Sequence, residues 1–392
     1  MHDLIIRNGL VIDGTGASGY KSDIAINGDR ITTIGQIETE AVNYIDASGL
    51  IVSPGFIDLH SHSDFQFFID PTADSKIRQG VTLELVGNCG QSFCAPLSGL
   101  SRGPLDTRAF WYPTEWKPDW TDFPGYMDAL EANESSLNIA TQVGHGTVRL
   151  SVLGMDMRTP VQGELKRMKF LVEEALDAGA FGFSTGLSMA PGCFSLTEEV
   201  IELADAAAHR NRLYSTHMRD SGSATTGLFV AMHEAIEIGR RTGVDVQMSH
   251  LKCNGPTRGR SDEILETIER SRKEGLNIAA DLYPYIAASG PMSGNEIPRW
   301  VQEGGREKAL ERLNDADIRA ETRSDIDIAT ALLGGPDRIT IANFPPDLSY
   351  EGKSLEEISS KIGVQPSETL IRIYEQFDAQ LILFGMAEPD VK

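Results

Sequence analysis

The first part of the chain alternates apolar and polar residues with the period of two that is typical of β-strands. Within residues 1–54 this pattern occurs in LIIRNGLVIDG and DIAINGDRITTIG, where Asn-Gly and Gly-Asp pairs indicate hairpin turns. From Gly55 onward, short apolar runs alternate with amphipathic segments, as in βα units around a parallel sheet. The pattern predicts an α/β protein with a small N-terminal β-module followed by a TIM-type (β/α)8 barrel.

Seven runs after Gly55 have the composition of barrel strands. They are FIDLHSH, VTLELVGNC, LNIATQVG, GAFGFSTG, LYSTHMR, VDVQMSHLK and LNIAADLYPY. Between them, ELKRMKFLVEEALDAG and TEEVIELADAAAHRN place apolar residues at helical spacing and are expected to form outer helices. An eighth strand is not visible, so we expect a truncated barrel whose sheet is open at two edges.

Two longer segments interrupt the repeat of strands and helices. Residues 94–124 are rich in Gly, Pro and Trp and predict a loop over the barrel mouth. Residues 286–347 carry their own helical pattern and the strand-like run RITIANF, so they predict an insertion after the seventh strand. The expected organisation is therefore a module at 1–54 and a barrel domain at 55–392.

Charge and cysteine usage restrict the partners and the compartment. A net charge of −22 argues against a nucleic-acid partner, and it means that an anionic substrate requires a local cationic clamp. No apolar run approaches the roughly 20 residues that span a bilayer, and the N-terminus lacks the features of a signal peptide. The four scattered cysteines do not suggest a disulfide framework, so we expect a cytoplasmic protein without a membrane partner.

Side chains that bind metals recur where the predicted strands end, which is the active-site edge of such barrels. His60 and His62 close the first run, and the strand period places both on one side. Cys89 ends the second run in GNCG, where glycines let the backbone approach a ligand closely. His217 and His250 end the fifth and sixth runs. One thiolate and two imidazoles suit Zn²⁺ and leave a position open for water, so a catalytic metal site is predicted.

A single histidine at a strand end is more often a packing residue than a ligand, so the prediction depends on the five residues occurring together. His2, His209 and His233 fall in a terminus and two helical segments and carry no predicted role. His145, in VGHGTVR, either lines the site or makes a structural hydrogen bond to a neighbouring loop. It is therefore left out of the ligand set.

Two cations follow the proposed ligands at the spacing that places them on the same side of a strand. Arg219 lies two residues after His217, and Lys252 lies two residues after His250. Each is either a solvated loop charge or part of a clamp. In an acidic chain, two such cations favour binding of a carboxylate or a polarised carbonyl.

These motifs together resemble a known family. GFIDLHSHSD, GVTLELVGNCG, GHGTVRL, GAFGFSTGL, STHMR, SHLK and DLYPYIAASG occur in the order and approximate spacing of the N-acyl-D-amino-acid deacylases, within the amidohydrolase superfamily. The HxH motif alone indicates only the superfamily, whereas its combination with GNCG and SHLK is much more specific. The resemblance covers nearly the whole chain.

The resemblance implies a zinc-dependent enzyme that releases a carboxylic acid and a D-amino acid from an N-acyl-D-amino acid. Cys89, His217 and His250 would hold the tightly bound zinc, and His60 and His62 a weaker second site. Lys252, Tyr283 and Ser289 match substrate-contacting positions. The N-terminal strands would belong to a β-sandwich that is completed by the C-terminal end of a full-length protein.

The chain departs from the family pattern at two places. STGL continues with Met189 nearby instead of the usual tyrosine, which bears on acyl-chain or side-chain preference. The family's proton-shuttling aspartate, in a GSDG-like motif, would lie beyond Lys392. Asp390 does not replace it, because an acidic residue at a helix start is explained by capping. The sequence is therefore expected to be a fragment or a degraded relative.

Two other functions remain open at this point. Cyclic-amide hydrolases such as hydantoinases and dihydroorotases share HxH and the barrel, but they commonly bridge two metals with a lysine on the fourth strand. That strand has no lysine here, and Lys166 and Lys169 lie earlier in a helix with surface spacing. A non-catalytic metal-binding remnant is the second alternative, which the missing aspartate motivates.

Overall fold

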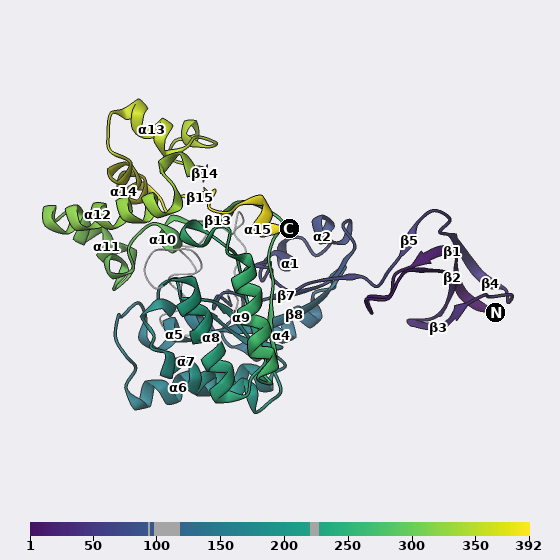
Figure 1. The fold of residues 1–392 in the computed structure, drawn as a ribbon. Helices are drawn as coiled ribbons and strands as arrows, with labels where there is room; N and C mark the ends of the chain where they lie inside the picture. Colours follow the sequence, from purple (N-terminus) through teal and green to yellow (C-terminus); the bar gives the residue numbers. More distant parts are fainter. Residues whose placement is uncertain (93–94, 98–117, 220–226) are drawn as a thin grey trace. The chain divides into compact units, whose positions relative to one another are not determined.

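The computed structural model describes residues 1–92, 95–97, 118–219 and 227–392, which form two compact units (Figure 1). The smaller unit comprises Met1–Ile57 and Asp74–Leu83, and the larger comprises Asp58–Ala73 and Glu84–Lys392. None of the helices in these ranges is long and apolar enough to cross a membrane.

The smaller unit contains the strands expected at the N-terminus. They are β1 His2–Val11, β2 Tyr20–Asn27, β3 Arg30–Gly35, β4 Ala41–Asp46 and β5 Ile51–Val52. Their order is β3-β2-β1-β4, with β5 also paired to β1. The Asn-Gly pair at residue 27 joins β2 to β3 as predicted, whereas Asn8 lies inside β1 at a register shift with a φ of 64°. This second Asn-Gly pair therefore forms a β-bulge and not a turn.

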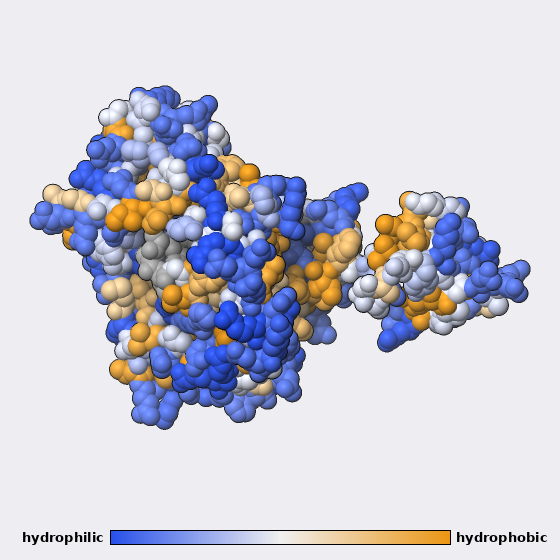
Figure 2. Space-filling view, in the orientation of Figure 1, coloured by the Kyte–Doolittle hydropathy of each residue, from blue (hydrophilic) through white to orange (hydrophobic). Residues whose placement is uncertain are grey.

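Only a small core stabilises this unit. Ile5, Ala25 and Ile37 are buried together, while many apolar side chains of the same sheet are exposed. The apolar residues with an exposed fraction above 45% include Ile31, Ile34, Val42, Tyr44, Ile45, Leu50 and Ile51. The space-filling view shows apolar residues at the surface of this part of the chain (Figure 2).

The larger sheet is curled like half of a barrel, and its strands follow one another in chain order. Its strands are β6 Phe56–Asp58, β7 Val81–Val86, β8 Asn138–Gly144, β9 Gly182–Gly186, β10 Leu213–His217, β11 Val246–Met248 and β12 Ile278–Ala280. From β8 to β12 each neighbouring pair is parallel. All seven predicted strands are present, and within the described ranges the sheet has its edges at β6 and β12.

Helices cover this sheet on the outside (Figure 1). They are α4 Phe123–Ala132, α5 His145–Leu153, α6 Gln162–Asp177, α7 Thr197–Ala208, α8 Leu228–Thr242 and α9 Ser261–Lys273, preceded by the short α1 Gln66–Ile69 and α2 Asp74–Ile77. The two helices expected from sequence are α6 and α7. Their apolar faces pack with strand residues such as Phe183 and Tyr214 in the largest hydrophobic core. Most of the expected loop at 94–124 lies outside the described residues.

A second substructure follows β12. Its antiparallel sheet has the order β13-β15-β14, from β13 Ala288–Pro291, β14 Ile339–Asn343 and β15 Gln380–Leu383. The helices are α10 Met292–Asn295, α11 Arg306–Leu313, α12 Ala316–Leu333, α13 Leu355–Ile362, α14 Pro366–Gln376 and α15 Glu388–Val391. Its separate core extends from Met292 to Leu383, and thus beyond residue 347. The predicted run RITIANF contains β14.

Candidate metal centre

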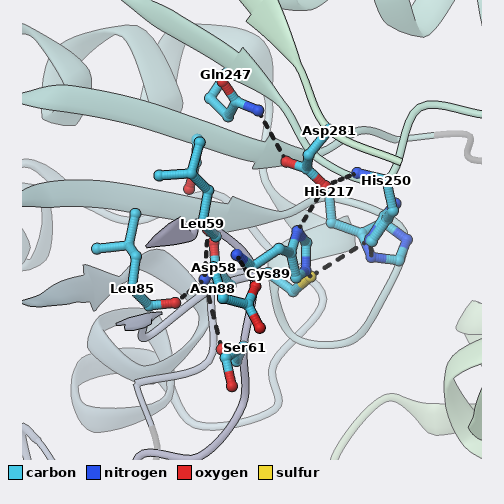
Figure 3. Close-up of polar contacts among 12 residues, drawn as sticks. Asp58, Leu59, Ser61, Leu85, Asn88, Cys89, His217, Gln247, His250 and Asp281 are labelled. Carbon is cyan, nitrogen blue, oxygen red and sulfur yellow. Dashed lines mark hydrogen bonds and ion pairs between the residues drawn. The ribbon is translucent and has the colours of Figure 1, made fainter. Parts of the chain in front are cut away.

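The five residues predicted as metal ligands meet beyond the carboxyl ends of the large sheet. They form two groups, His60 with His62 and Cys89, and Cys89 with His217 and His250. Within each group the donor atoms all lie within 4.8 Å of one another. Cys89 belongs to both groups, so its sulfur is placed to serve two metal positions. Figure 3 shows Cys89, His217 and His250 converging.

The strands are shorter than predicted, and most of the ligands lie just after them. β6 ends at Asp58 and β11 at Met248, so among the five ligands only His217 is a strand residue. His250 has a φ of 37°, in the left-handed region that non-glycine residues rarely adopt. The period of two therefore does not explain why the histidines face one another, because turns orient these side chains.

Cys89 also has a left-handed backbone, with a φ of 55°, and its loop is tightly enclosed. The Ser184 hydroxyl accepts a hydrogen bond from the Gly90 amide at 3.1 Å and donates one to the Gly87 carbonyl. A Cβ at Gly186 would lie 2.1 Å from the Cys89 carbonyl oxygen, so no side chain fits there. Strand β9 therefore holds the loop that carries the sulfur.

The Cys89 sulfur lies 3.3 Å from His60 Nε2 and 3.4 Å from His250 Nε2. Burial alone would raise the pKa of this thiol, but electrostatic interactions with His60 and His250 and hydrogen bonds from His217 and His250 bring it well below its usual range. Cys89 is thus set up as a thiolate, which is the form that binds metals.

The histidines of the second group are poised as neutral ligands. His250 Nε2 lies 2.8 Å from His217 Nδ1, and the two rings meet edge to face. Burial lowers the pKa of both imidazoles, and for His250 the adjacent Lys252 cation lowers it further. His60 differs: burial lowers its pKa, but Cys89 and Asp281 outweigh that effect and raise it to about 10. His62 is exposed, with its ring 5.6 Å from that of His60.

Lys252 and Tyr283 lie together beside the centre. The Lys252 ammonium is 3.2 Å from His250 Nδ1 and 5.3 Å from the centre of the Tyr283 ring. Burial lowers the Lys252 pKa to about 8 and raises that of Tyr283. A buried cation next to the proposed metal ligands is suited to bind an anionic group of a small substrate.

Arg219 and Ser289 are engaged by protein partners. Arg219 donates to Glu234 in α8 from Nε at 3.0 Å and from a terminal nitrogen at 2.8 Å, and it also donates to the Cys193 carbonyl. The guanidinium is therefore committed to an ion pair, which favours a structural role over the predicted clamp. The Ser289 hydroxyl in β13 donates to the Leu381 carbonyl and accepts from Gln380.

His145 makes a structural hydrogen bond, but its partner lies in helix α7 and not in the neighbouring loop that was predicted. Its Nε2 lies 2.8 Å from one Glu199 oxygen, and Arg149 donates to the other at 2.6 Å. All three side chains are buried. Because Glu199 belongs to α7 while His145 and Arg149 belong to α5, this network joins two helices, and none of its three residues belongs to either ligand group.

Two residues of the site were not predicted from the sequence. Asp281, directly after β12, accepts hydrogen bonds from His60, Gln247 and the backbone of His250. Asn88 donates from its amide to the carbonyls of Leu59, Ser61 and Leu85, which links the loop of the first two histidines to the loop of Cys89 (Figure 3). Their position in the sequence could have identified them, because both lie at strand ends within the GNCG and DLYPY motifs.

Comparisons with known proteins agree with this geometry. The amidohydrolase family model matches residues 43–280. The chain is 39% identical over 290 residues to N-acyl-D-glutamate deacylase of Alcaligenes xylosoxydans xylosoxydans, covering 73% of this chain and 58% of that protein. It is 33% identical over 393 residues to D-aminoacylase of the same organism, covering 100% of this chain and 71% of the relative.

The solved structures that resemble this chain also include a D-aminoacylase and an N-acyl-D-glutamate deacylase. A D-aminoacylase structure described as having a binuclear metal centre matches with a TM-score of 0.80 at 32% identity, covering 100% of this chain and 73% of the other. N-acyl-D-glutamate deacylase from Bordetella bronchiseptica, in complex with zinc and a phosphonate inhibitor, matches with a TM-score of 0.78 at 33% identity and the same coverage. This chain therefore spans roughly three fifths to three quarters of the length of these proteins.

Proposed function

This chain belongs to the N-acyl-D-amino-acid deacylases of the amidohydrolase family, and from that premise we propose that it hydrolyses the amide bond of N-acyl-D-amino acids. The products would be a carboxylic acid and a free D-amino acid. The observation that carries the proposal is the pair of ligand groups that share Cys89, with the buried Lys252 beside them.

The donor set fits zinc. A thiolate with two imidazoles is a common set for this ion, and three protein ligands leave a position open. We propose that Cys89, His217 and His250 form the tight site, and that His60 and His62 together with Cys89 form a weaker one. When bound, zinc supplies a water whose pKa is lowered to about 7.

The side chains around the ligands would orient the substrate. Lys252 would pair with the carboxylate of the D-amino acid, because it is the buried cation beside the ligands. Tyr283 would position the same group from the face that Lys252 contacts. Ser289 would contact the substrate in addition to Gln380, or in place of it, through its hydroxyl group. Arg219 would act on the site indirectly, through its ion pair with Glu234.

Proton transfer would use a group other than Asp281. Both carboxylate oxygens of Asp281 already accept hydrogen bonds, and one of them faces a ligand histidine. Following the resemblance, the proton shuttle would be a different aspartate. We also propose that the curled sheet is part of a (β/α)8 barrel and that the small sheet is half of a β-sandwich. The exposed apolar side chains of the small sheet support the second point.

A cyclic-amide hydrolase is the less favoured alternative. Strand β9, at the position of the bridging lysine, reads GFSTG, and all five of its residues are buried. Lys169 lies outside on α6, where it pairs with Glu202 at 2.8 Å. The sulfur of Cys89 occupies the shared position between the two ligand groups.

The test compares the 392-residue chain with a version that includes any coding sequence that follows Lys392 in frame. Both are assayed for zinc content and for activity on N-acetyl-D-amino acids, with the L-enantiomers as the matched control. We expect zinc in both forms and D-specific activity in the extended form. Zinc without turnover in either form would favour the non-catalytic remnant, and turnover of hydantoins alone would favour the cyclic-amide alternative.

A further inference from the structure

Asp281 touches both halves of the proposed metal centre. It follows β12 directly, and its main chain is paired with β11: its amide donates to the Met248 carbonyl at 3.2 Å and its carbonyl accepts from the Leu251 amide at 2.8 Å. These two bonds bracket the turn that contains His250. The position of the Asp281 carboxylate is therefore fixed by the backbone of the adjacent strand.

One carboxylate oxygen serves a ligand from each group. Oδ1 lies 3.0 Å from His60 Nδ1 and 2.6 Å from the backbone nitrogen of His250. The other oxygen, Oδ2, accepts from Gln247 Nε2 at 2.9 Å (Figure 3). Three donors thus converge on a carboxylate that is largely buried, which is the arrangement that holds a side chain in one orientation.

These bonds have different effects on the two histidines. Because a carboxylate only accepts, His60 donates to Asp281 from Nδ1. In the neutral form that binds a metal, this leaves the lone pair on Nε2, which faces the Cys89 sulfur 3.3 Å away. For His250 the bond acts on the backbone, where it supports the unusual φ of 37° that directs the ring toward Cys89 and His217.

We propose that Asp281 is a positioning residue that couples the two metal subsites, by setting the tautomer of His60 and the backbone conformation of His250 through one shared oxygen. This inference rests on the proposed metal centre. It assigns Asp281 no contact with substrate and no step in the reaction.

The consequence is that a change at Asp281 affects metal binding in both subsites. Replacing a partner of a metal-binding histidine typically lowers metal affinity about 10–100-fold. Asp281→Asn keeps the shape of the side chain but removes its charge. An Asn NH₂ group in the place of Oδ2 would face the Gln247 NH₂ group, which is also a donor, unless one of the two side-chain amides rotates. Asp281→Ala removes all three side-chain hydrogen bonds and is expected to have the larger effect.

The experiment titrates the metal-free full chain with zinc in competition with a chromophoric chelator, and with Co²⁺ to follow the thiolate-to-cobalt absorption of Cys89. The wild type, Asp281→Asn, Asp281→Ala and Asp245→Asn are compared. Asp245 is an exposed aspartate immediately before β11, so it is the matched control. We expect about 10-fold weaker zinc binding or more at both subsites in Asp281→Asn, together with a shifted cobalt spectrum, and wild-type behaviour in Asp245→Asn.

The possible outcomes test the role of Asp281, the coupling of the two subsites and the metal centre separately. Wild-type affinities and spectrum in both Asp281 variants would overturn the inference while leaving the metal centre intact. Weakening confined to the His60 and His62 subsite would overturn the coupling, since Asp281 would then serve His60 alone. Absence of metal binding by the wild type would overturn the proposed function itself. If Asp281→Ala does not fold, the isosteric Asp281→Asn carries the test.

Discussion

Cys89 is the residue on which the two ligand groups depend, because its sulfur is the donor that they share. Its surroundings show how a single side chain is prepared for this purpose. The backbone of Cys89 is left-handed, the flanking glycines admit the close contact with β9, and the adjacent histidines favour the thiolate. Each of these features acts on one residue, and each can be tested by one substitution.

Cys89→Ala removes a donor from both subsites. We therefore expect loss of tightly bound zinc and of activity, because two imidazoles remain in one group and two in the other. Metal analysis after gel filtration measures the effect. Cys193→Ala is the control, since burial raises the pKa of that thiol to about 11 and it lies outside both groups. Stoichiometric zinc in Cys89→Ala would contradict the assignment.

Lys252→Met keeps a long apolar stem and removes the buried charge. If this cation pairs with the substrate carboxylate, KM is expected to rise about 10-fold or more, because a hydrogen bond to a charged group contributes about 1.5–3 kcal/mol. Zinc content should stay at the wild-type level. Steady-state kinetics of the active form supply the measurement, and an unchanged KM would count against the clamp.

Glu296 should make stability depend on pH. Burial raises its pKa from 4.5 to about 7, and its Oε2 has no hydrogen-bond partner. The protonated form of the Glu296 carboxyl is therefore favoured in the folded state. Its contribution to the free energy of unfolding is complete below pH 4.5 and is lost as pH rises through 7. We expect Glu296→Gln to be more stable than the wild type at pH 8, by about 1–3 kcal/mol, and similar at pH 4.5.

The measurement for Glu296 is urea unfolding at both pH values. Glu269→Gln is the control, because that side chain is exposed in the middle of α9. Equal stabilities of Glu296→Gln and the wild type at pH 8 would show that the folded protein hydrates or pairs this carboxylate.

At the scale of elements, the buried network of His145, Arg149 and Glu199 ties α5 to α7. Glu199→Gln leaves the Arg149 cation without its anionic partner in a buried position. Since breaking a buried ion pair costs about 3–5 kcal/mol, a loss of stability of that order is expected. Denaturant unfolding measures it, with the surface variant Glu202→Gln as the comparison. Metal content should be unchanged, and selective zinc loss would instead place this network in the site.

Strand ends were the part of the fold that best predicted the site. Apolar runs identified all seven strands, and the ligands were found because they follow those runs directly. The predicted ends of the strands were wrong by several residues. The strands stop at turns such as the one at His250, and these turns depend on hydrogen bonds to other strands. Asp281, the Glu234 partner of Arg219 and the bulge at Asn8 were missed for the same reason, because each depends on a tertiary contact or a register that periodicity does not contain.

At the scale of the whole molecule, the metal centre joins segments that are far apart in sequence. Its ligands come from residues 60 to 250, so a bound ion closes several long loops at once. We expect a chelator to lower the unfolding temperature, because an ion that binds only the folded state stabilises it by mass action. Differential scanning calorimetry tests this. Cys89→Ala should unfold at the same temperature with and without chelator, and an equal response in both proteins would place the stabilising ion elsewhere.

The substructure after β12 begins and ends at nearly the same point. Strand β13, which starts at Ala288, pairs with the end of β15 at Leu383, and the Met386 amide donates to the Ile286 carbonyl at 3.2 Å. The two ends of this substructure are therefore adjacent, as the ends of inserted domains are. In evolutionary terms, such a segment can be lengthened, exchanged or lost without re-threading the strands that carry the ligands. Exchange among relatives would then alter the surroundings of Ser289 while the metal chemistry is inherited unchanged.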